Sequence, residues 1–219
     1  MATSETSLQS YYAARAPEYD SVYRKPERQP DLRAIEAWLA PRFAGETVLE
    51  VACGTGYWTR FIAPPAARVV AVDCAPQTLQ IAAARVPEDK ARFVVGDAYA
   101  LEVGLGVFSA AFAGFWFSHV PKARQREFLI GLNQRLKPGA KVVVLDNRYV
   151  EGNSSRITAQ DPQGNTYQTR TLTDGSVHSV LKNFPTEAEL QAAIGGLGAS
   201  GRLTQWPYYW AFEYVAAGP

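Results

Sequence analysis

Five short apolar runs recur along the first two thirds of the chain. Valine, other β-branched residues and aromatic residues dominate them, and polar or turn-forming residues bound each run. This pattern predicts buried β-strands. They lie at residues 46–51, 68–72, 91–95, 107–113 and 141–145.

Segments with apolar residues at helical spacing separate these runs. A helix is expected over 31–39, before the first strand, and others follow the strands at 57–63, 76–86 and 122–136. Strands that alternate with helices indicate a parallel sheet covered by helices on both faces, which is a doubly wound α/β fold.

The last third of the chain departs from this alternation. Two stretches of alternating residues, 167–173 and 176–181, flank Asp174-Gly175, which is a strong hairpin signal. We expect an antiparallel flap that covers the mouth of the site, with a contact between two copies of the chain as the alternative. A helix capped by Thr186 and two final strands, one of them antiparallel, should complete the fold.

The first strand runs into a turn of small residues, Ala52-Cys53-Gly54-Thr55-Gly56. Gly54 and Gly56 allow backbone torsions that other residues resist, and they let a ligand approach the main chain. A strand, a glycine turn and a helix start form a nucleotide-binding corner in a doubly wound sheet. Pyrophosphate motifs do not fit, because Ala52 replaces the first glycine and no lysine follows. Glu50 would repel phosphate and suits an ammonium group.

The run Leu49-Glu50-Val51-Ala52-Cys53-Gly54-Thr55-Gly56 resembles motif I of the class I S-adenosylmethionine-dependent methyltransferases. The resemblance implies a Rossmann-like, doubly wound, seven-stranded and mostly parallel sheet with an antiparallel strand, an N-terminal helical lid and an inserted β-hairpin flap. It also implies that Ala52, Cys53, Gly54 and Gly56 contact the cofactor S-adenosyl-L-methionine, and that Glu50 orients its amino-acid end.

The resemblance covers about residues 11–215, and the chain is expected to form a single methyltransferase domain. Its parts follow one another along residues 1–219. They are a disordered start (1–7), the lid (8–40), the cofactor-binding core (41–149), the hairpin flap (150–184) and a C-terminal helix with strands (185–219).

Acidic residues also end the second and third predicted strands. Asp73 follows the second strand and Asp97 the third, and open α/β sheets bind ligands at the carboxyl ends of their strands. Together with Glu50, these acids favour a neutral or cationic nucleoside. By the resemblance, Asp73 holds the ribose and Asp97 the adenine, with Cys74 and Ala98 beside them. Asp73 can also cap the following helix.

The loop after the fourth strand, residues 114–121, is rich in aromatic residues. It lacks the Asn-Pro-Pro-Tyr and Pro-Cys motifs of enzymes that methylate nucleic acids or protein glutamine. Phe115 and Trp116 are therefore expected to bind a small, partly apolar or aromatic acceptor. His119 is the candidate catalytic base, with a structural histidine as the alternative.

Asp146-Asn147-Arg148 follows the fifth strand. Catechol-type methyltransferases hold magnesium with an Asp-Asn pair at this place, but they also need an acid after the fourth strand. This chain has Gly114-Phe115-Trp116 there. No metal is therefore expected, and Asn147 and Arg148 are assigned to the substrate side.

The lid segment holds four tyrosines within residues 8–23. By the resemblance, such a lid closes over the cofactor and helps to wall the substrate pocket, and aromatic faces attract a sulfonium cation. Tyr11 and Tyr19 are assigned to the cofactor and Tyr12 to the substrate. Packing against the core is an equal alternative for each of them.

Charge and cysteine content limit the partners. The formal net charge of +1 gives no strong field toward nucleic acid or an acidic membrane. The basic cluster Arg24, Lys25, Arg28 and Arg33 is interrupted by proline and acids, and we interpret it as a solvated face. Two cysteines expected to be free thiols, no apolar span and no hydrophobic leader indicate a cytoplasmic monomer or homodimer acting on a small molecule.

The expected activity is methyl transfer from S-adenosyl-L-methionine by in-line displacement, with S-adenosyl-L-homocysteine as the product. Two alternatives stay open. One is a protein that binds the cofactor without transferring its methyl group. The other is a nicotinamide-dependent oxidoreductase, which is disfavoured by Ala52 and by the lack of a Tyr-x-x-x-Lys pair near residue 150.

Overall fold

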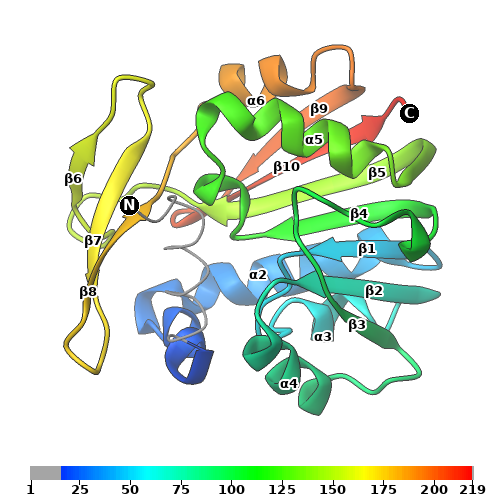
Figure 1. The fold of residues 1–219 in the computed structure, drawn as a ribbon, viewed down its shortest axis with the longest axis horizontal. Coiled ribbons are helices and arrows are strands. Elements are labelled where there is room, and N and C mark those ends of the chain that lie inside the picture. The colour runs from blue at the N-terminus through cyan, green and yellow to red at the C-terminus, as the bar shows by residue number, and fades with distance from the viewer. Residues whose placement is uncertain (1–15, 219) are drawn as a thin grey trace.

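A computed structural model describes residues 16–218 of the chain (Figure 1). Within these residues, seven strands form one sheet in the order β3-β2-β1-β4-β5-β10-β9. Neighbours from β3 to β5 are parallel, and β10 runs antiparallel to both β5 and β9. The predicted sheet is thus confirmed. Its strands are β1 Thr47–Val51, β2 Arg68–Asp73, β3 Ala91–Val95, β4 Phe108–Gly114, β5 Leu136–Asn147, β9 Gly198–Gln205 and β10 Tyr209–Ala216.

The strand order reverses direction between β1 and β4, which makes their carboxyl ends the natural ligand-binding edge of the sheet. In the register, Val51 of β1 pairs with Val72 of β2 on one side and with Ala113 of β4 on the other. The turns that follow these three strands therefore meet at one edge.

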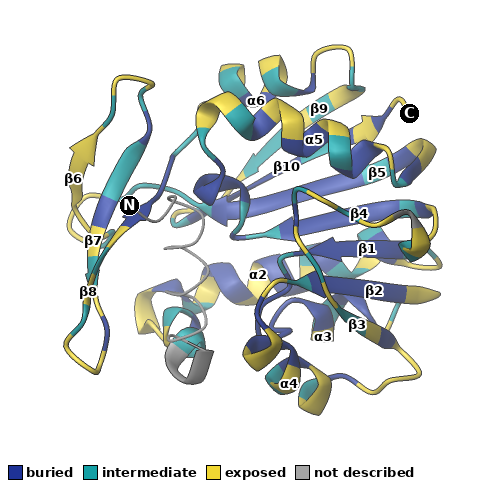
Figure 2. Ribbon diagram, viewed as in Figure 1, coloured by how far each residue is buried: buried dark blue, intermediate teal, exposed yellow. Residues whose placement is uncertain are grey.

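Helices cover both faces of the sheet, whose central strands are mostly buried, whereas the edge strands β3 and β9 are largely exposed or half-buried (Figure 2). Apolar residues of β1 alternate between the faces, so that Val48 joins one core and Leu49 the other. The first core includes residues of the helices α2 Gln29–Leu39, α3 Thr59–Ile62 and α4 Pro76–Arg85, and the second includes residues of α5 Gln125–Asn133 and α6 Glu187–Ile194. Short 3-10 helices are η1 Ala16–Tyr23, η2 Pro26–Arg28, η3 Ala40–Phe43, η4 Val103–Leu105, η5 Phe117–His119 and η6 Lys122–Arg124.

Several boundaries differ from the sequence-based expectation. The helix predicted over 57–63 is only the four-residue α3, and the one predicted over 122–136 is the turn η6 followed by α5. Residues 137–140, which separate the predicted helix over 122–136 from the predicted strand over 141–145, lie inside β5. There the pairing with β4 skips from Phe108–Leu136 to Ala110–Lys141, because Pro138 and a left-handed Gly139 (φ 81°) interrupt a strand that resumes in register.

A second sheet is inserted after β5. The predicted hairpin is confirmed as β7 Thr166–Thr171 paired antiparallel with β8 Val177–Leu181. The strand β6 Ile157–Gln160, which pairs with β7, was not predicted. Its residues alternate between apolar and polar types, but the strand is only four residues long and all four are exposed. The helix cap predicted at Thr186 is also present, and it takes the form of a capping box with Glu189 as its partner.

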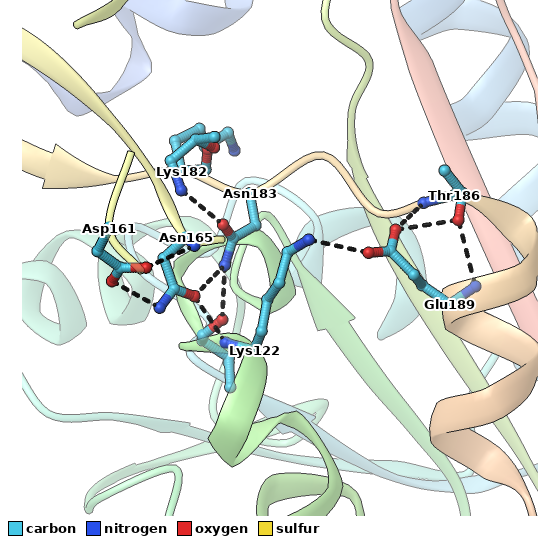
Figure 3. Close-up of polar contacts among 9 residues, drawn as sticks. Lys122, Asp161, Asn165, Lys182, Asn183, Thr186 and Glu189 are labelled. Atoms are coloured by element: carbon cyan, nitrogen blue, oxygen red, sulfur yellow. Dashed lines mark hydrogen bonds and ion pairs between the residues drawn. The ribbon is translucent and has the colours of Figure 1, made fainter. Parts of the chain in front are cut away.

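Polar side chains fix one end of the second sheet to the body of the protein (Figure 3). The Asn183 main chain donates to the Ser118 carbonyl at 2.7 Å, and its side chain donates to the Val120 carbonyl at 3.1 Å. The Asn183 amide also reaches Asn165, whose oxygen accepts from the Lys122 main chain at 2.8 Å. The end of β8 is therefore tied to η5 and η6.

Candidate active site

The turn after β1 has the backbone geometry that its small residues predict. Ala52, Gly54 and Gly56 all have positive φ, at 54°, 55° and 72°. A Cβ on Gly56 would lie 2.9 Å from the Cβ of Ala82 in α4, so glycine is needed for the helix to pack there. Ala52 carries a side chain in this strained region, which costs about 1 kcal/mol or more. Such strain is typical of a functional turn.

Asp73, at the end of β2, ties this turn to α4. One carboxylate oxygen accepts from the Gly54 main chain at 2.8 Å, and the other accepts from the Ala75 main chain at 2.9 Å and the Thr78 hydroxyl at 3.2 Å. Burial raises the pKa of Asp73, and these donors oppose the rise. The carboxylate thus joins the glycine turn to the start of α4 without capping the helix, and its remaining lone pairs have capacity for further hydroxyl donors.

Glu50 is buried in β1, with 1 % of its surface exposed. Its Oε2 atom has no hydrogen-bond partner among the described residues. Burial raises the pKa of Glu50 to about 8, the hydroxyl of Thr59 opposes this, and the charge of Asp73 adds to it. A buried carboxyl oxygen without a partner fits a cationic ligand group, such as the ammonium of S-adenosylmethionine.

Asp97 completes a row of acids at the ends of three neighbouring strands, β1, β2 and β3. It is exposed and accepts from the Tyr99 main chain at 2.9 Å. Ala98 next to it is buried, as is Cys53, whereas Cys74 is exposed. Both cysteines are free thiols, as expected. The structure thus brings the predicted cofactor residues between positions 50 and 98 to one edge of the sheet, and their contact with the cofactor stays a prediction.

The segment η1 lies over the glycine turn. The Tyr19 ring is 3.7 Å from where a Cβ of Gly54 would stand. Asp20 accepts from the Thr55 hydroxyl at 2.7 Å and forms an ion pair with Arg85. Tyr23 instead belongs to the core, where it stacks on Tyr57. The predicted site residues Tyr11 and Tyr12 lie outside the described residues, as does the start 1–7.

A cavity of about 380 Å³ lies between η1, the loop after β4 and the second sheet. Tyr19, Phe115, His119 and Asn147, which the sequence assigned to the site, are among its lining residues. No aspartate or glutamate lines it among the described residues. Its cationic side chains are Lys25, Arg28, Arg170 and Lys182.

Lys182 is held by a buried ion pair. Its ammonium lies 2.7 Å from Asp146 Oδ1 and 2.6 Å from the Ser118 hydroxyl, and the two charged side chains are 4 % and 0 % exposed. Asp146 also accepts from the Ser118 and Asn147 main chains. Asp146 therefore fixes the ends of β5 and β8 and the loop η5 to one another.

His119 is buried at the cavity wall, and its Nδ1 lies 2.6 Å from the Leu181 carbonyl oxygen. A carbonyl can only accept, so Nδ1 carries the proton, and Nε2 is the basic nitrogen of the neutral ring. Phe115, next to it on the same loop, has φ of 58° and donates its main-chain N–H to the Leu145 carbonyl at 2.7 Å. The loop is therefore held in a strained conformation beside the cavity.

Other assigned residues lie elsewhere. Trp116 is not among the residues that line the cavity; it packs on Tyr99 and Phe128, with ring centroids 5.8 and 6.4 Å away. The Arg148 side chain donates a hydrogen bond to the Trp206 carbonyl oxygen at 2.9 Å.

The interpretation of the basic cluster as a solvated face was wrong for Arg28, which is 7 % exposed. Its tertiary partner is Asn153, which is 125 residues away in the sequence and left no local signal. Lys25, Arg170 and Lys182 were missed as well. The available hint was that Lys182 directly follows the apolar pair Val180-Leu181 at the end of β8.

Comparison with known proteins identifies the family. A family model described as a methyltransferase domain matches residues 48–139. An uncharacterized methyltransferase of Synechocystis sp., sll0829, is 31% identical over 102 residues, and a demethylmenaquinone methyltransferase of Lactococcus lactis is 29% identical over 114 residues. These matches cover 47% and 48% of this chain and 47% and 43% of those proteins, so the chain matches less than half the length of these curated relatives.

A solved structure matches over nearly the whole chain. The DhpI complex with S-adenosylhomocysteine (SAH) has a TM-score of 0.79 and 30% sequence identity, and the match covers 98% of this chain and 97% of that one. The glycine turn and the row of acids are the parts of this chain that fit the same cofactor. The chain is a member of the class I S-adenosylmethionine-dependent methyltransferase family.

Proposed function

We propose that this protein transfers the methyl group of S-adenosylmethionine to an oxygen of a small acidic molecule. One observation carries the proposal: four cationic side chains and no carboxylate line the cavity among the described residues. Charge of one sign on the wall of a cavity favours a ligand of the opposite sign. The volume of about 380 Å³ is that of a small-molecule site.

The lining also provides for the rest of the acceptor. Phe115, Leu172 and Phe184 offer apolar surface, which suits the partly apolar acceptor expected from the aromatic loop. Ser154 and Ser155 add neutral polar groups from the segment between β5 and β6. An acid with a short apolar body fits this combination of surfaces.

When bound, S-adenosylmethionine would supply a methyl group on a positively charged sulfur. An acceptor oxygen would bond to the methyl carbon from the side opposite the sulfur, as the carbon–sulfur bond breaks and neutral S-adenosylhomocysteine leaves. The protein contributes alignment, with the turn at Gly54 and the acids Glu50 and Asp73 on the donor side and the cationic groups on the acceptor side. An ionised acid carries no proton at the attacking oxygen. His119 then positions the acceptor, and it acts as the base only for an acceptor that is protonated.

The experiment is an acceptor panel. Small carboxylic acids and phosphate monoesters, each paired with its neutral amide or ester, are incubated with S-adenosylmethionine, and release of S-adenosylhomocysteine is measured against a reaction without acceptor. We expect release with acids and none with their neutral partners. Turnover of neutral aromatic compounds alone would contradict the acidic acceptor. Cofactor binding without release in any reaction would favour the non-catalytic alternative.

A further inference from the structure

Arg28 is a buried cation with an unusual partner. Its Nε donates to Oδ1 of Asn153 at 2.9 Å, and its Nη2 donates to the same oxygen. The rings of Tyr208 and Tyr209 lie 5.4 and 5.7 Å from the guanidinium carbon. Among residues 16–218, no carboxylate oxygen lies within ion-pair distance of Arg28. A buried guanidinium normally has an anionic partner, because an uncompensated charge is costly to remove from water.

Asn153 is itself held firmly in place. Its side-chain amide donates to Oε1 of Glu27 at 2.6 Å, and its carbonyl accepts from the Lys25 ammonium at 3.1 Å. Its main chain closes the turn after β5 by donating to the Val150 carbonyl at 3.1 Å. The side chain therefore presents a neutral oxygen to Arg28 at the place where a carboxylate would neutralise it.

The cationic groups of the cavity differ in how their charge is balanced. Lys182 has Asp146 as a buried counter-ion, whereas Arg28 and Lys25 have only neutral oxygens within contact among the described residues. Partial burial and the neighbouring charge of Arg28 lower the pKa of Lys25. Glu27 offsets the repulsion between Lys25 and Arg28 only in part, and an anion on the η2 side of the cavity would relieve the remainder.

We propose that Asn153 is a positioning residue that fixes Arg28 against the cavity through a neutral oxygen, so that the guanidinium keeps its charge for the acidic group of the methyl acceptor. This inference rests on the proposed acidic acceptor and adds which cation selects it. Asparagine and aspartate have almost the same shape. The choice between them at position 153 therefore sets how strongly the cavity binds an anion.

The test uses two variants, Glu27→Gln and the double variant Glu27→Gln with Asn153→Asp. The double variant keeps the wild-type net charge and moves one negative charge from exposed position 27 to the contact of Arg28. It also keeps a hydrogen bond between positions 27 and 153, because the new amide donates to the new carboxylate. The single variant is the matched control.

Inorganic phosphate is the probe, titrated by calorimetry into protein saturated with S-adenosylhomocysteine at neutral pH and constant ionic strength. We expect Glu27→Gln to bind phosphate within about twofold of wild type. The double variant should bind phosphate at least about tenfold more weakly than wild type, because the carboxylate introduced at position 153 forms an ion pair with Arg28. Its melting temperature without phosphate should rise, because a buried charge gains a partner.

A merely structural role for Asn153 would lower phosphate affinity and melting temperature together, and that result would overturn the proposal. Wild-type affinity for phosphate in the double variant would also overturn the proposal about Asn153, but it would not contradict the proposal that the acceptor is acidic. If wild type itself binds no phosphate, the cavity is not an oxyanion site, and both the proposed function and this inference fall.

Discussion

Glu50 should carry its proton at neutral pH when no cofactor is bound. The perturbation that tests this is Glu50→Gln, which mimics the protonated side chain in shape and stays neutral at every pH. In wild type, burial raises the pKa of Glu50 from 4.5 to about 8. Above about pH 4.5 the unfolded chain ionises at this position, while the folded chain holds its proton until about pH 8. The unfolded state then binds fewer protons, so wild-type stability falls as pH rises through this window.

The magnitude follows from the size of the pKa shift. Each pH unit between the two pKa values lowers the free energy of unfolding by about 1.4 kcal/mol. Because the slope flattens near the folded pKa, the loss between about pH 6 and about pH 8 is about 2 kcal/mol. The variant lacks this loss. Its stability relative to wild type should therefore grow by about 2 kcal/mol over the same range.

Urea denaturation of both proteins at the two pH values measures this difference, and comparison with the variant removes the contributions of other titrating groups. A stability difference that does not change with pH would contradict the raised pKa of Glu50, because it would mean that Glu50 is already ionised in the protein without cofactor. In the same account, binding of S-adenosylhomocysteine to wild type releases about one proton at neutral pH, and binding to the variant releases none. Calorimetry in buffers of different ionisation enthalpy measures the release.

Four further variants test other parts of the site. Asp73→Ala should weaken S-adenosylhomocysteine binding by about tenfold or more in calorimetry without unfolding the domain, because a charged hydrogen-bond acceptor is lost; unchanged affinity would remove Asp73 from the site. Lys182→Met should lower the free energy of unfolding by about 3–5 kcal/mol, because it leaves the buried Asp146 carboxylate without a counter-ion. The double variant Lys182→Met with Asp146→Asn should recover part of the lost stability, and an equal loss of stability in both variants would contradict the ion-pair argument. His119→Gln should change kcat by less than about tenfold with an acidic acceptor, whereas a loss of about 10²–10⁴ would identify His119 as a catalytic base.

The main sheet was predictable because its signals are local. The runs that became β1, β2, β3 and β4 are apolar and bounded by turn residues, and their ends differ from prediction by about one residue. The elements that were not predicted correctly depend on tertiary context. The exposed strand β6 has no burial pattern to read, and the start of β5 is set by its pairing with β4 across a break that looks like a turn.

The cofactor side of the site was easier to predict from the sequence than the acceptor side, again because its signals are local. The predicted cofactor residues lie in one short turn and in acids at or near the ends of successive strands, so Glu50, Asp73 and Asp97 could be assigned to the cofactor from the sequence. The acceptor side is assembled from η2, the segment after β5 and the second sheet. Arg28 and Arg170 meet at one cavity only through the fold, and no spacing in the sequence connects them.

The most direct test of the account is a crystal structure with S-adenosylhomocysteine and phosphate bound together. We predict the adenosine between Asp73 and Asp97, the amino group toward Glu50, and phosphate within hydrogen-bond distance of Arg28 in the cavity beyond the thioether sulfur. A cofactor lying away from the turn at Gly54, or phosphate absent from the cavity while bound elsewhere, would contradict the account.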